Sequence, residues 1–532
     1  MGSVNLHINS RCETENGIRL LNNERLYIMH TVRLLLNTTS YDRYIIDKRF
    51  HAVSHIHNVL VKHAMKLLKK LSFDTEYQNL RQQYRVLLKK GKLTESDKKT
   101  RKQLSTNMHK ILNSYGLSEF AFQAYIRVCA KQFKKLLSSH QIQKEATRVW
   151  KGVKAVLYGN GKELHFKKGS TFETIGGKEN TSGARFSKDD MILRWLGLSI
   201  ECKLPRHSEY IKESLTGEIS YCEIERKMFP NGWHYYVIVY LKGDAPHKLK
   251  KVGSAENTTG LDMGVSTIAA VSDKSVMLAE LAPKCSEYNK RISKILVSMD
   301  ASRRAMNLNK YNADGSIKKG NRDKWVFSKT YIKNLRKLRS LYRQKSAYIK
   351  QSHREMINKL LAESVNFIVE DMTFKGLARR AKETKRSDKI IEIKQKDGSV
   401  KTVNKFYRKK RFGRSMNNRA PALFLTLLSE KTAAYGGCVH KVDTKEFKAS
   451  QFDHTTGECT KHKLSEREKE VGGRMVQRDL YSAFLLKNAN STQDKPDVDK
   501  CKYEFDNFLR LQDNALASMK ANGISMKQCF GF

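Results

Sequence analysis

The sequence has few prolines and no pattern of paired cysteines. Only six of its 532 residues are proline, and the first is Pro205, so the preceding residues contain no helix-breaking ring. The nine cysteines are scattered along the chain, odd in number and never arranged as CxxC. This usage is typical of free thiols in a reducing compartment, and it argues against a disulfide framework.

Long apolar segments and several enzyme motifs are also missing. No apolar run reaches the roughly eighteen residues that a membrane-spanning helix needs. No secretory signal peptide is visible, and Met1-Gly2 is not followed by the Ser or Thr at position 6 of a myristoylation signal. P-loop, GxSxG and HExxH motifs are absent. We therefore expect a soluble protein of the cytoplasm.

Acidic residues are few compared with basic ones. Lys and Arg number 101 and Asp and Glu number 54, which gives a formal net charge of +47. Repulsion on this scale would destabilise a compact chain that lacks counter-charge. A polyanionic partner supplies that counter-charge, and nucleic acid is the commonest such partner.

The first 250 residues divide into a helical part and a β-rich part. Apolar residues over 43–71 recur at spacings of three, four or seven, which predicts an amphipathic helix. A basic stretch, Lys89–Lys102, is expected to interrupt the helical pattern. Residues 153–245 change to short strands, including a hairpin that turns at residues 230–232. A β-prone piece at 25–36 can complete this part, with the helical module inserted into it.

The remaining chain alternates strands and helices. Strands are predicted on either side of Gly264 within 260–271 and at 365–369 and 438–442, with helical regions at 272–363, at 423–435, from Asp479 onward and over a last amphipathic stretch that ends at Asn522-Gly523. Residues 375–420 are expected to be a basic loop region with a hairpin near Asp397-Gly398, and the segment that leads to Val476 is expected to be irregular.

Three carboxylates occupy unusual places in this pattern. Asp262 lies inside an apolar strand, Glu370 ends another, and Asp479 begins a helix. Glu370 follows Asp262 by 108 residues, and Asp479 follows Glu370 by 109, so only a folded sheet could bring the three together. Carboxylates converging at a sheet edge could bind two Mg²⁺ ions and hydrolyse a phosphodiester. Each residue could instead be an ordinary turn or cap residue.

The three sites and their order resemble a split RuvC nuclease. Leu261-Asp262-Met263-Gly264, Ile368-Val369-Glu370-Asp371 and Arg478-Asp479 look like its three motifs. Over residues 255–490 the chain resembles the transposon-encoded TnpB nucleases and the compact type V CRISPR effectors. The resemblance implies an RNA-guided DNA endonuclease of RNase H fold, in which Asp262, Glu370 and Asp479 are catalytic residues and Mg²⁺ ligands.

The same resemblance implies an α/β multidomain fold. An RNase H-like (RuvC) nuclease domain would follow an N-terminal β-barrel wedge domain that is interrupted by an α-helical recognition lobe. The expected parts are the wedge at 1–40 and 151–250, the recognition lobe at 41–150, the nuclease domain with basic helices and a lid at 251–442, a degenerate zinc-finger-like segment that binds target nucleic acid at 443–478, and the C-terminal part of the nuclease at 479–532.

The zinc site of these relatives is not expected in this chain. Asp453 and Thr456 stand where the first cysteine pair belongs, and Gly472-Gly473 lies where the second pair should end. The alternative is a makeshift site of His454, Cys459 and His462, whose irregular spacing makes it a weak ligand set. The third motif is also atypical, because Tyr481-Ser482-Ala483 replaces the usual Asn-Ala-Ala.

Two basic clusters lie between the second and third motifs. They comprise Arg379, Arg380, Lys385 and Arg386, then Arg408, Lys409, Lys410 and Arg411. Aromatic residues are interleaved with them, so a lid that touches the nucleic-acid backbone is one interpretation, and a solvated basic face is the other.

The sequence therefore favours an RNA-guided DNA endonuclease with guide RNA and target DNA as partners. Base pairing would select the target, and the protein would read a short flanking motif. A guided DNA-binding regulator without cleavage and a guide-independent RNase H-like nuclease or recombinase are the alternatives. Monomer or homodimer and transposon or CRISPR origin of the guide stay open, although the large helical module favours the CRISPR side.

Overall fold

The computed structural model describes residues 29–90, 94–159, 161–206, 208–246, 252–378, 386–394, 399–406, 413–461 and 466–524. The chain forms two compact units, Met1–Lys248 and Leu249–Phe532. Each unit combines helices with β-sheet, as the predicted α/β multidomain class requires. Within the described residues no helix is both long enough and apolar enough to cross a bilayer.

In the described residues of the first unit, the helical part contains five α-helices. They are α1 (Ser40–Leu71), α2 (Thr75–Lys89), α3 (Glu95–Ser114), α4 (Glu119–Ala130) and α5 (Ser139–Leu157). The prediction that Lys89–Lys102 interrupts the helices is wrong in its second half, because α3 starts inside that stretch. Thr94 and Asp97 form a reciprocal capping box there, which satisfies the free N–H groups of the first turn.

The described strands of the first unit form one seven-stranded sheet in the order β2-β6-β7-β1-β5-β4-β3. Their bounds are β1 (Met29–Leu36), β2 (Thr174–Gly176), β3 (Ala184–Ser187), β4 (Ile192–Trp195), β5 (Leu198–Lys203), β6 (Ile219–Phe229) and β7 (Gly232–Lys242), and the short helix α6 (Glu209–Leu215) precedes β6. Strand β1 pairs with both β7 and β5 in the middle of the sheet. The five helices therefore separate β1 in sequence from the strands that are its neighbours in the sheet.

This sheet is curled but open in the part of the chain that the structure describes. Its edge strands β2 and β3 are not paired with each other. The thiol of Cys222 on β6 nevertheless donates to the carbonyl oxygen of Ala184 at the start of β3, at 3.2 Å, so the far end of the sheet folds back toward β6. The described strands thus form a half-barrel rather than the β-barrel that the family resemblance implies.

Arg226 of β6 holds helix α1 on this sheet. Its guanidinium pairs with Asp47 of α1 at 2.6 Å and donates to the carbonyl oxygen of Phe172 at 2.9 Å. It also lies over the rings of Phe50 and Trp233, at 4.1 and 4.4 Å from their centroids. A buried cation that is paired and hydrogen-bonded in this way fixes the position of a helix strongly, because removing Asp47 would leave the buried guanidinium of Arg226 without its counter-charge.

The second unit is built on a five-stranded sheet in the order β10-β9-β8-β11-β14. The strands are β8 (Ser254–Met263), β9 (Thr267–Val271), β10 (Val276–Glu280), β11 (Ser364–Glu370) and β14 (Cys438–Val442). Strands β8, β11 and β14 are parallel, and β9 and β10 are antiparallel to their neighbours. The sequence prediction of helix directly after Val271 is wrong here, because Ser272 and Ser275 close a turn that returns the chain as β10.

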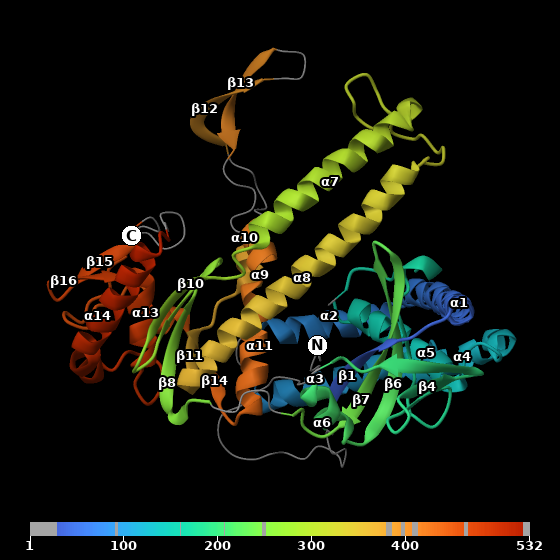
Figure 1. Cartoon of the computed structure of the whole chain (residues 1–532), viewed down its shortest axis with the longest axis horizontal. Helices are drawn as coiled ribbons and strands as arrows, with labels where there is room; N and C mark the ends of the chain where they lie inside the picture. The colour runs from blue at the N-terminus through green and yellow to red at the C-terminus, as the bar shows by residue number, and fades with distance from the viewer. Residues whose placement is uncertain are drawn as a thin grey trace. The chain divides into compact units, whose positions relative to one another are not determined.

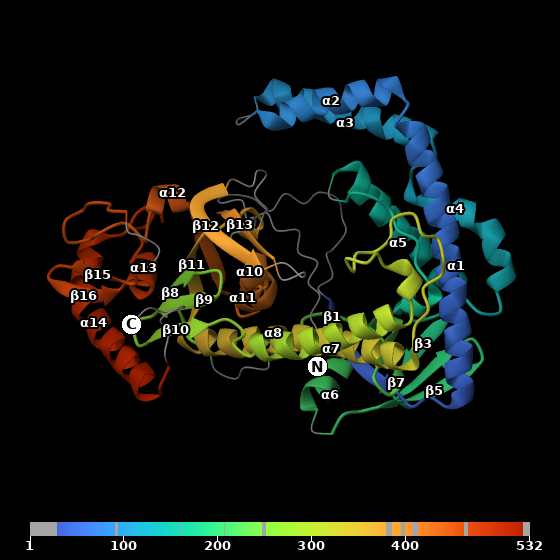
Figure 2. The same cartoon turned by 90° about the horizontal axis from the view of Figure 1, so that it is seen from above.

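Helices cover both faces of this sheet (Figure 1). Helices α13 (Arg478–Lys487) and α14 (Val498–Ala521) cover one face, and α8 (Lys329–Glu363) and α11 (Pro421–Ala434) cover the other. Helix α7 (Cys285–Ala305) runs beside α8 as a long helical hairpin, which Figure 2 shows from above. The short helices α9 (Phe374–Ala378) and α10 (Gly413–Arg419) flank a separate hairpin of β12 (Arg386–Lys394) and β13 (Val400–Phe406).

The segment that leads to Val476 is more regular than the sequence predicts. It contains the short helix α12 (Thr444–Phe447) and a hairpin of β15 (Glu468–Val471) and β16 (Arg474–Gln477). Gly472 and Gly473 make the two-residue turn, with φ values of 55° and 72°. Two consecutive positive φ values are what a type I′ hairpin turn requires, and glycine adopts them without strain.

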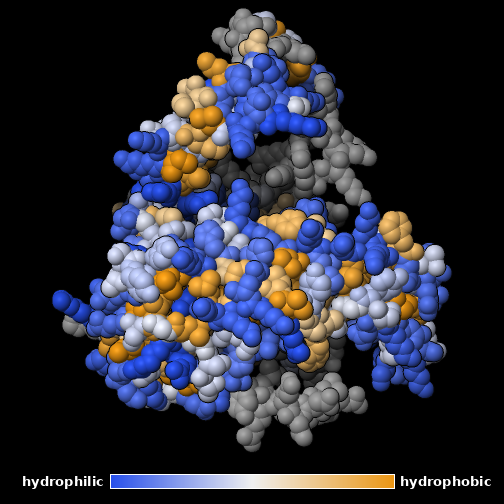
Figure 3. Space-filling model, turned by 90° about the vertical axis from the view of Figure 1, so that its right-hand side faces the viewer, coloured by the Kyte–Doolittle hydropathy of each residue, from blue (hydrophilic) through white to orange (hydrophobic). Residues whose placement is uncertain are grey.

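Charged and polar residues dominate the surface in the orientation of Figure 3. Hydrophilic residues predominate on that face, and hydrophobic residues gather only in small groups between them. Beneath the surface, the buried apolar side chains of each unit form core clusters of its own. The high net charge is thus carried by a folded chain with packed interiors.

Candidate active site

Asp262 and Glu370 lie side by side at the carboxyl ends of two parallel strands. In the β8–β11 ladder Leu261 pairs with Val369, so the next residue on each strand is one of the two carboxylates. Leu261 and Val369 pack into the core with α8 and α11. Because side chains alternate along a strand, Asp262 and Glu370 face the opposite side, which α13 covers.

Helix α13 brings Asp479 to the same place because Gly260 lets it approach closely. A Cβ at Gly260 would lie 1.9 Å from the carbonyl oxygen of Ala483 and 2.4 Å from the nitrogen of Lys487. From Gly260 to Asp262 the strand advances about 6.6 Å. From Ala483 back to Asp479 the helix advances about 6 Å. The two carboxylates therefore meet at one end of the strand–helix contact.

The three predicted carboxylates interact electrostatically across this site. The pKa of Asp262 is raised well above its ordinary value, first because the carboxyl is buried and then because Asp479 and Glu370 are close. Arg478 and Arg467 act in the opposite direction. An ionised Asp262 is thus costly in this environment unless a further positive charge joins the site.

Glu370 is linked to the segment that follows β14. Its pKa is also raised, because the carboxyl is buried. A hydrogen bond from the backbone of Ala449 opposes that shift. Ala449 belongs to the Lys448-Ala449-Ser450-Gln451 stretch, so this turn contacts the second motif directly. The neighbouring Asp371 is exposed and lies 3.6 Å from Lys441.

Two arginines to which the sequence analysis gave no role contact Asp479. Arg478 approaches one carboxylate oxygen of Asp479 at 3.1 Å, and Arg467 approaches the other at 3.5 Å. Arg478 is the residue just before the aspartate, so its adjacency was a usable signal. Arg467 precedes β15, and only the fold of that hairpin brings it back to α13.

The chemistry of this site fits a hard divalent cation, although no metal-ligating geometry is formed. Among the described residues, no three His, Cys, Asp or Glu side chains are arranged to hold a metal ion. The donors that converge are all carboxylate oxygens, which Mg²⁺ prefers. A cation among them would favour the ionised state of Asp262 that burial and its neighbours disfavour. Arg467 and Arg478 would then have to move away from the carboxylate of Asp479.

The segment in place of the zinc finger carries an apolar core. Phe447, Val471 and Val476 are buried against α13 and α14. His454 is also buried, and its Nδ1 lies 2.7 Å from the hydroxyl of Tyr481. Tyr481 is one of the two residues at which this chain departs from the third motif of the proteins it resembles, and its hydroxyl contributes to this packing.

The other proposed zinc ligands lie apart from this core or outside the described residues. Cys459 is exposed, and His462 is not among the described residues. Asp453, at a position of the lost cysteine pair, accepts hydrogen bonds from Thr455 at 2.7 and 2.9 Å, which closes its own turn.

Most of the predicted backbone-binding basic clusters lie outside the described residues. These are Arg379, Arg380, Lys385, Arg408, Lys409, Lys410 and Arg411. Arg386 begins strand β12, opposite Phe406 of β13. The lid interpretation stays a prediction.

Comparisons with known proteins find similarity in structure only. No protein-family model matches the chain, and no curated protein matches it in sequence. A cryo-EM structure of a Cas12f1–sgRNA–target DNA complex is similar at 10% identity and a TM-score of 0.46, covering 87% of this chain and 99% of that one. A CRISPR-Cas12f ternary complex is similar at 13% identity and a TM-score of 0.27, covering 86% of this chain and 98% of that one. Both are compact type V CRISPR effectors, the class that the sequence motifs resemble.

Proposed function

We propose that this protein is an RNA-guided DNA endonuclease with a single RuvC-type site. The observation that carries the proposal is the convergence of Asp262, Glu370 and Asp479 at one end of the sheet, from sequence positions more than one hundred residues apart. A cluster of mutually repelling, partly buried carboxylates is costly for stability, so it is typical of a functional site. The net charge of +47 supports nucleic acid as the substrate.

The residues of the chain would act in distinct ways in this site. Asp262, Glu370 and Asp479 would hold Mg²⁺, for which two ions are expected, and the ions would supply charge neutralisation and an activated water for phosphodiester hydrolysis. Arg467 and Arg478 balance the negative charge of Asp479. Their guanidinium groups would also lie beside a substrate phosphate that enters the site. Gly260 fixes the distance between helix and sheet on which the three carboxylates depend.

The other parts of the chain would hold the nucleic acids. The protein would act in the cytoplasm, and it would associate with the nucleoid when it is bound to DNA. The helical part at 41–150 would be the recognition lobe, residues 1–40 and 151–250 the wedge, 251–442 and 479–532 the RuvC domain, and 443–478 the segment that binds target nucleic acid. Guide RNA and target DNA are the proposed partners, and a short flanking motif would be read by the protein.

A test of the proposal begins with the RNA that the protein carries. The protein is purified from cells that hold its native locus, and the bound nucleic acid is sequenced. A discrete structured RNA is the expected result. Heterogeneous RNA, or none, would contradict guidance and favour the guide-independent nuclease.

Cleavage is then assayed on matching DNA with Mg²⁺. We expect the wild type to cut, Asp262→Ala to bind without cutting, and Asp371→Asn to cut like the wild type, because Asp371 is exposed beside the site. Equal cutting by wild type and Asp262→Ala would overturn the assignment of the site. Guided binding without cutting by the wild type would favour the regulator.

A further inference from the structure

An open groove lies between the first half of α7 and the end of α10. Its volume is about 770 Å³, and it is lined by Ser286, Asn289, Lys290, Ser293, Lys294, Val297, Asn418 and Arg419. With the exception of Val297, every lining side chain carries a hydrogen-bond donor. No aromatic ring is among them, so the groove is suited to a charged backbone rather than to stacked bases.

Lys345 of α8 orients two of the lining amides. Its Nζ donates to Oδ1 of Asn289 at 2.8 Å and to Oδ1 of Asn418 at 2.7 Å. Because an ammonium group can only donate, it is the oxygen of each amide that faces Lys345. The amide NH₂ groups of both residues are left as donors for the groove. This side of the groove therefore suits a ligand that carries negative charge or strong hydrogen-bond acceptors.

The lysines of the groove lack acidic partners. Within the described part of the chain, Lys290, Lys294 and Lys345 form no ion pair with a carboxylate. Lys290 and Lys294 are one turn apart on the same side of α7, so they can contact successive phosphates of a strand.

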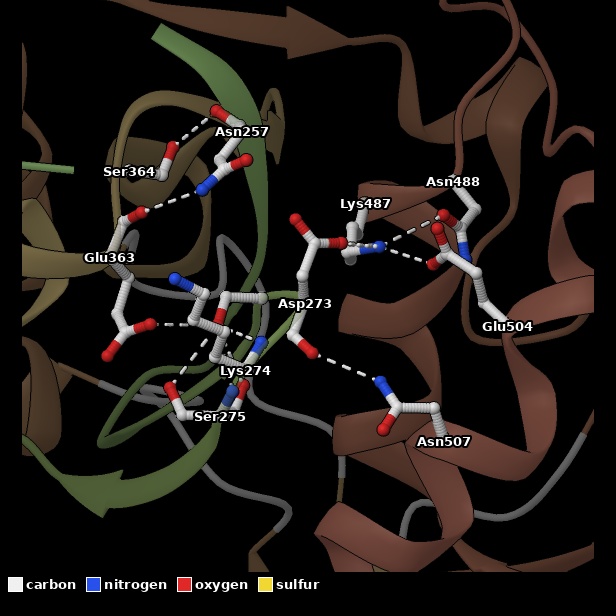
Figure 4. Close-up of polar contacts among 11 residues, drawn as sticks. Asn257, Asp273, Lys274, Ser275, Glu363, Ser364, Lys487, Asn488, Glu504 and Asn507 are labelled. Atoms are coloured by element: carbon white, nitrogen blue, oxygen red, sulfur yellow. Dashed lines mark hydrogen bonds and ion pairs between the residues drawn. The ribbon is translucent and has the colours of Figure 1, made fainter. Parts of the chain in front are cut away.

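A lysine with a structural role looks different in this unit. Lys487 of α13 is buried and pairs with Asp273 at 2.6 Å and with Glu504, as Figure 4 shows. Its charge is therefore compensated within the protein. Among the described residues, Lys290 and Lys294 have no carboxylate that compensates their charge in this way.

The groove begins at the end of the sheet that holds the carboxylates. Glu280, the last residue of β10, pairs with Thr267, which follows the turn after β8. Arg419 forms an ion pair with Glu280 and so ties the end of α10 to this corner. Helix α7 starts five residues after Glu280. A strand lying in the groove is thus directed toward the site of cleavage.

We propose that this groove binds the phosphodiester backbone of the DNA strand that is cut. The inference rests on the proposed function, since it takes the nearby carboxylates as the cleavage site. Lys290 and Lys294 contact the phosphates, and Asn289 and Asn418 donate to phosphate oxygens. Lys345 is a positioning residue that holds the two amides. The contacts involve no base edges, so binding in the groove is independent of sequence.

Photo-crosslinking tests the location of the strand. A photo-crosslinking amino acid is placed at position 293 in the full chain, and labelled oligo-dT or oligo-U is added in EDTA to prevent cutting. We expect oligo-dT to crosslink at position 293. The double variant Lys290→Gln/Lys294→Gln should reduce the yield about tenfold and lower the salt dependence of binding by about 1.4 in log–log slope, at about 0.7 per contact. Lys345→Met should reduce the yield as well.

A matched control uses another exposed pair of lysines one turn apart. Lys333→Gln/Lys337→Gln on α8 removes the same charge outside the groove and should leave the yield unchanged. No oligo-dT crosslink at 293, or the same yield in both double variants, would overturn the proposal. Preferential crosslinking of oligo-U would assign the groove to RNA and also reject it. The endonuclease proposal is judged separately, by guided cleavage with wild type and Asp262→Ala.

Discussion

Asp262 shows how a single residue can serve function at a cost in stability. Its carboxyl is buried beside two other carboxylates, and its pKa is raised for that reason. The ionised form is therefore less stable in the folded chain than in the unfolded chain. A cation that joins the site reverses this balance, so stability and metal binding should be coupled at this residue.

The substitution Asp262→Asn tests that coupling without an activity assay. In EDTA at neutral pH, we expect the variant to be more stable than the wild type, because the uncompensated charge is gone. In Mg²⁺ the wild type should gain stability and the variant should not. Thermal unfolding with and without Mg²⁺ measures both effects, and Asp371→Asn is the control. An equal response of Asp262→Asn and wild type to Mg²⁺ would argue against the carboxylates as ligands.

His353 of α8 gives a second prediction, for acid stability. It is fully buried against Phe424, and burial lowers its pKa from 6.5 to about 4. Between these pH values the unfolded chain binds a proton that the folded chain does not, so stability is full above pH 6.5 and falls as the pH drops toward 4. The loss reaches about 3 kcal/mol.

The substitution His353→Leu should remove this part of the acid sensitivity. Urea unfolding at neutral pH and near pH 4 gives the difference in free energy of unfolding, and it should be smaller for the variant than for the wild type. His109→Leu changes an exposed histidine and should leave the difference intact. An unchanged difference in His353→Leu would mean that other groups cause the acid sensitivity.

At the level of elements, the contact between β8 and α13 governs the geometry of the site. Gly260→Ala should destabilise the second unit by about 1–3 kcal/mol and abolish cleavage, because the added Cβ meets backbone atoms that cannot rotate away. Gly376→Ala in α9 is the matched control, since its Cβ would find the nearest atom at 3.4 Å. Chemical denaturation measures the loss of stability, and the cleavage assay measures the loss of activity. Full activity in Gly260→Ala would show that the helix can shift without loss of the site.

The sequence predicted the elements that carry strong local signals. The β6–β7 hairpin has a turn sequence of its own, and β11 is a short apolar run that ends in an acidic residue. The carboxylates could be predicted because a charge in an apolar strand is unusual. These features need no knowledge of distant contacts.

Other elements depend on contacts that the local sequence does not reveal. Strand β10 reads Val-Met-Leu-Ala-Glu, which suits a helix equally well, and pairing with β9 decides the outcome. The start of α3 did carry a local signal, its capping box, and the β15–β16 hairpin carried a Gly-Gly turn. Both signals lie within stretches in which charged residues dominate. Arg467 had none, because only the packed hairpin places it near Asp479.

For the whole molecule, the charge of +47 indicates nucleic-acid binding that depends strongly on salt. A protein that makes about six phosphate contacts loses about a thousandfold in affinity between about 50 mM and 200 mM salt. We expect at least this loss for the co-purified RNA, measured by fluorescence anisotropy over a salt series. An uncharged peptide nucleic acid of the same sequence should bind weakly at every salt concentration. Binding of the RNA that is insensitive to salt would contradict a polyanionic partner as the origin of this composition.

The position of β1 constrains how the first unit can assemble. Its partner strands β5 and β7 begin at Leu198 and Gly232, so more than 160 residues must leave the ribosome before β1 finds either neighbour. Until then its apolar sequence is an unpaired strand and a risk for aggregation. Helices α1 to α5 can form during this interval, since the backbone hydrogen bonds of a helix join residues only four apart. The insertion that divides the sheet in sequence thus makes assembly of the sheet a late event in the synthesis of the chain.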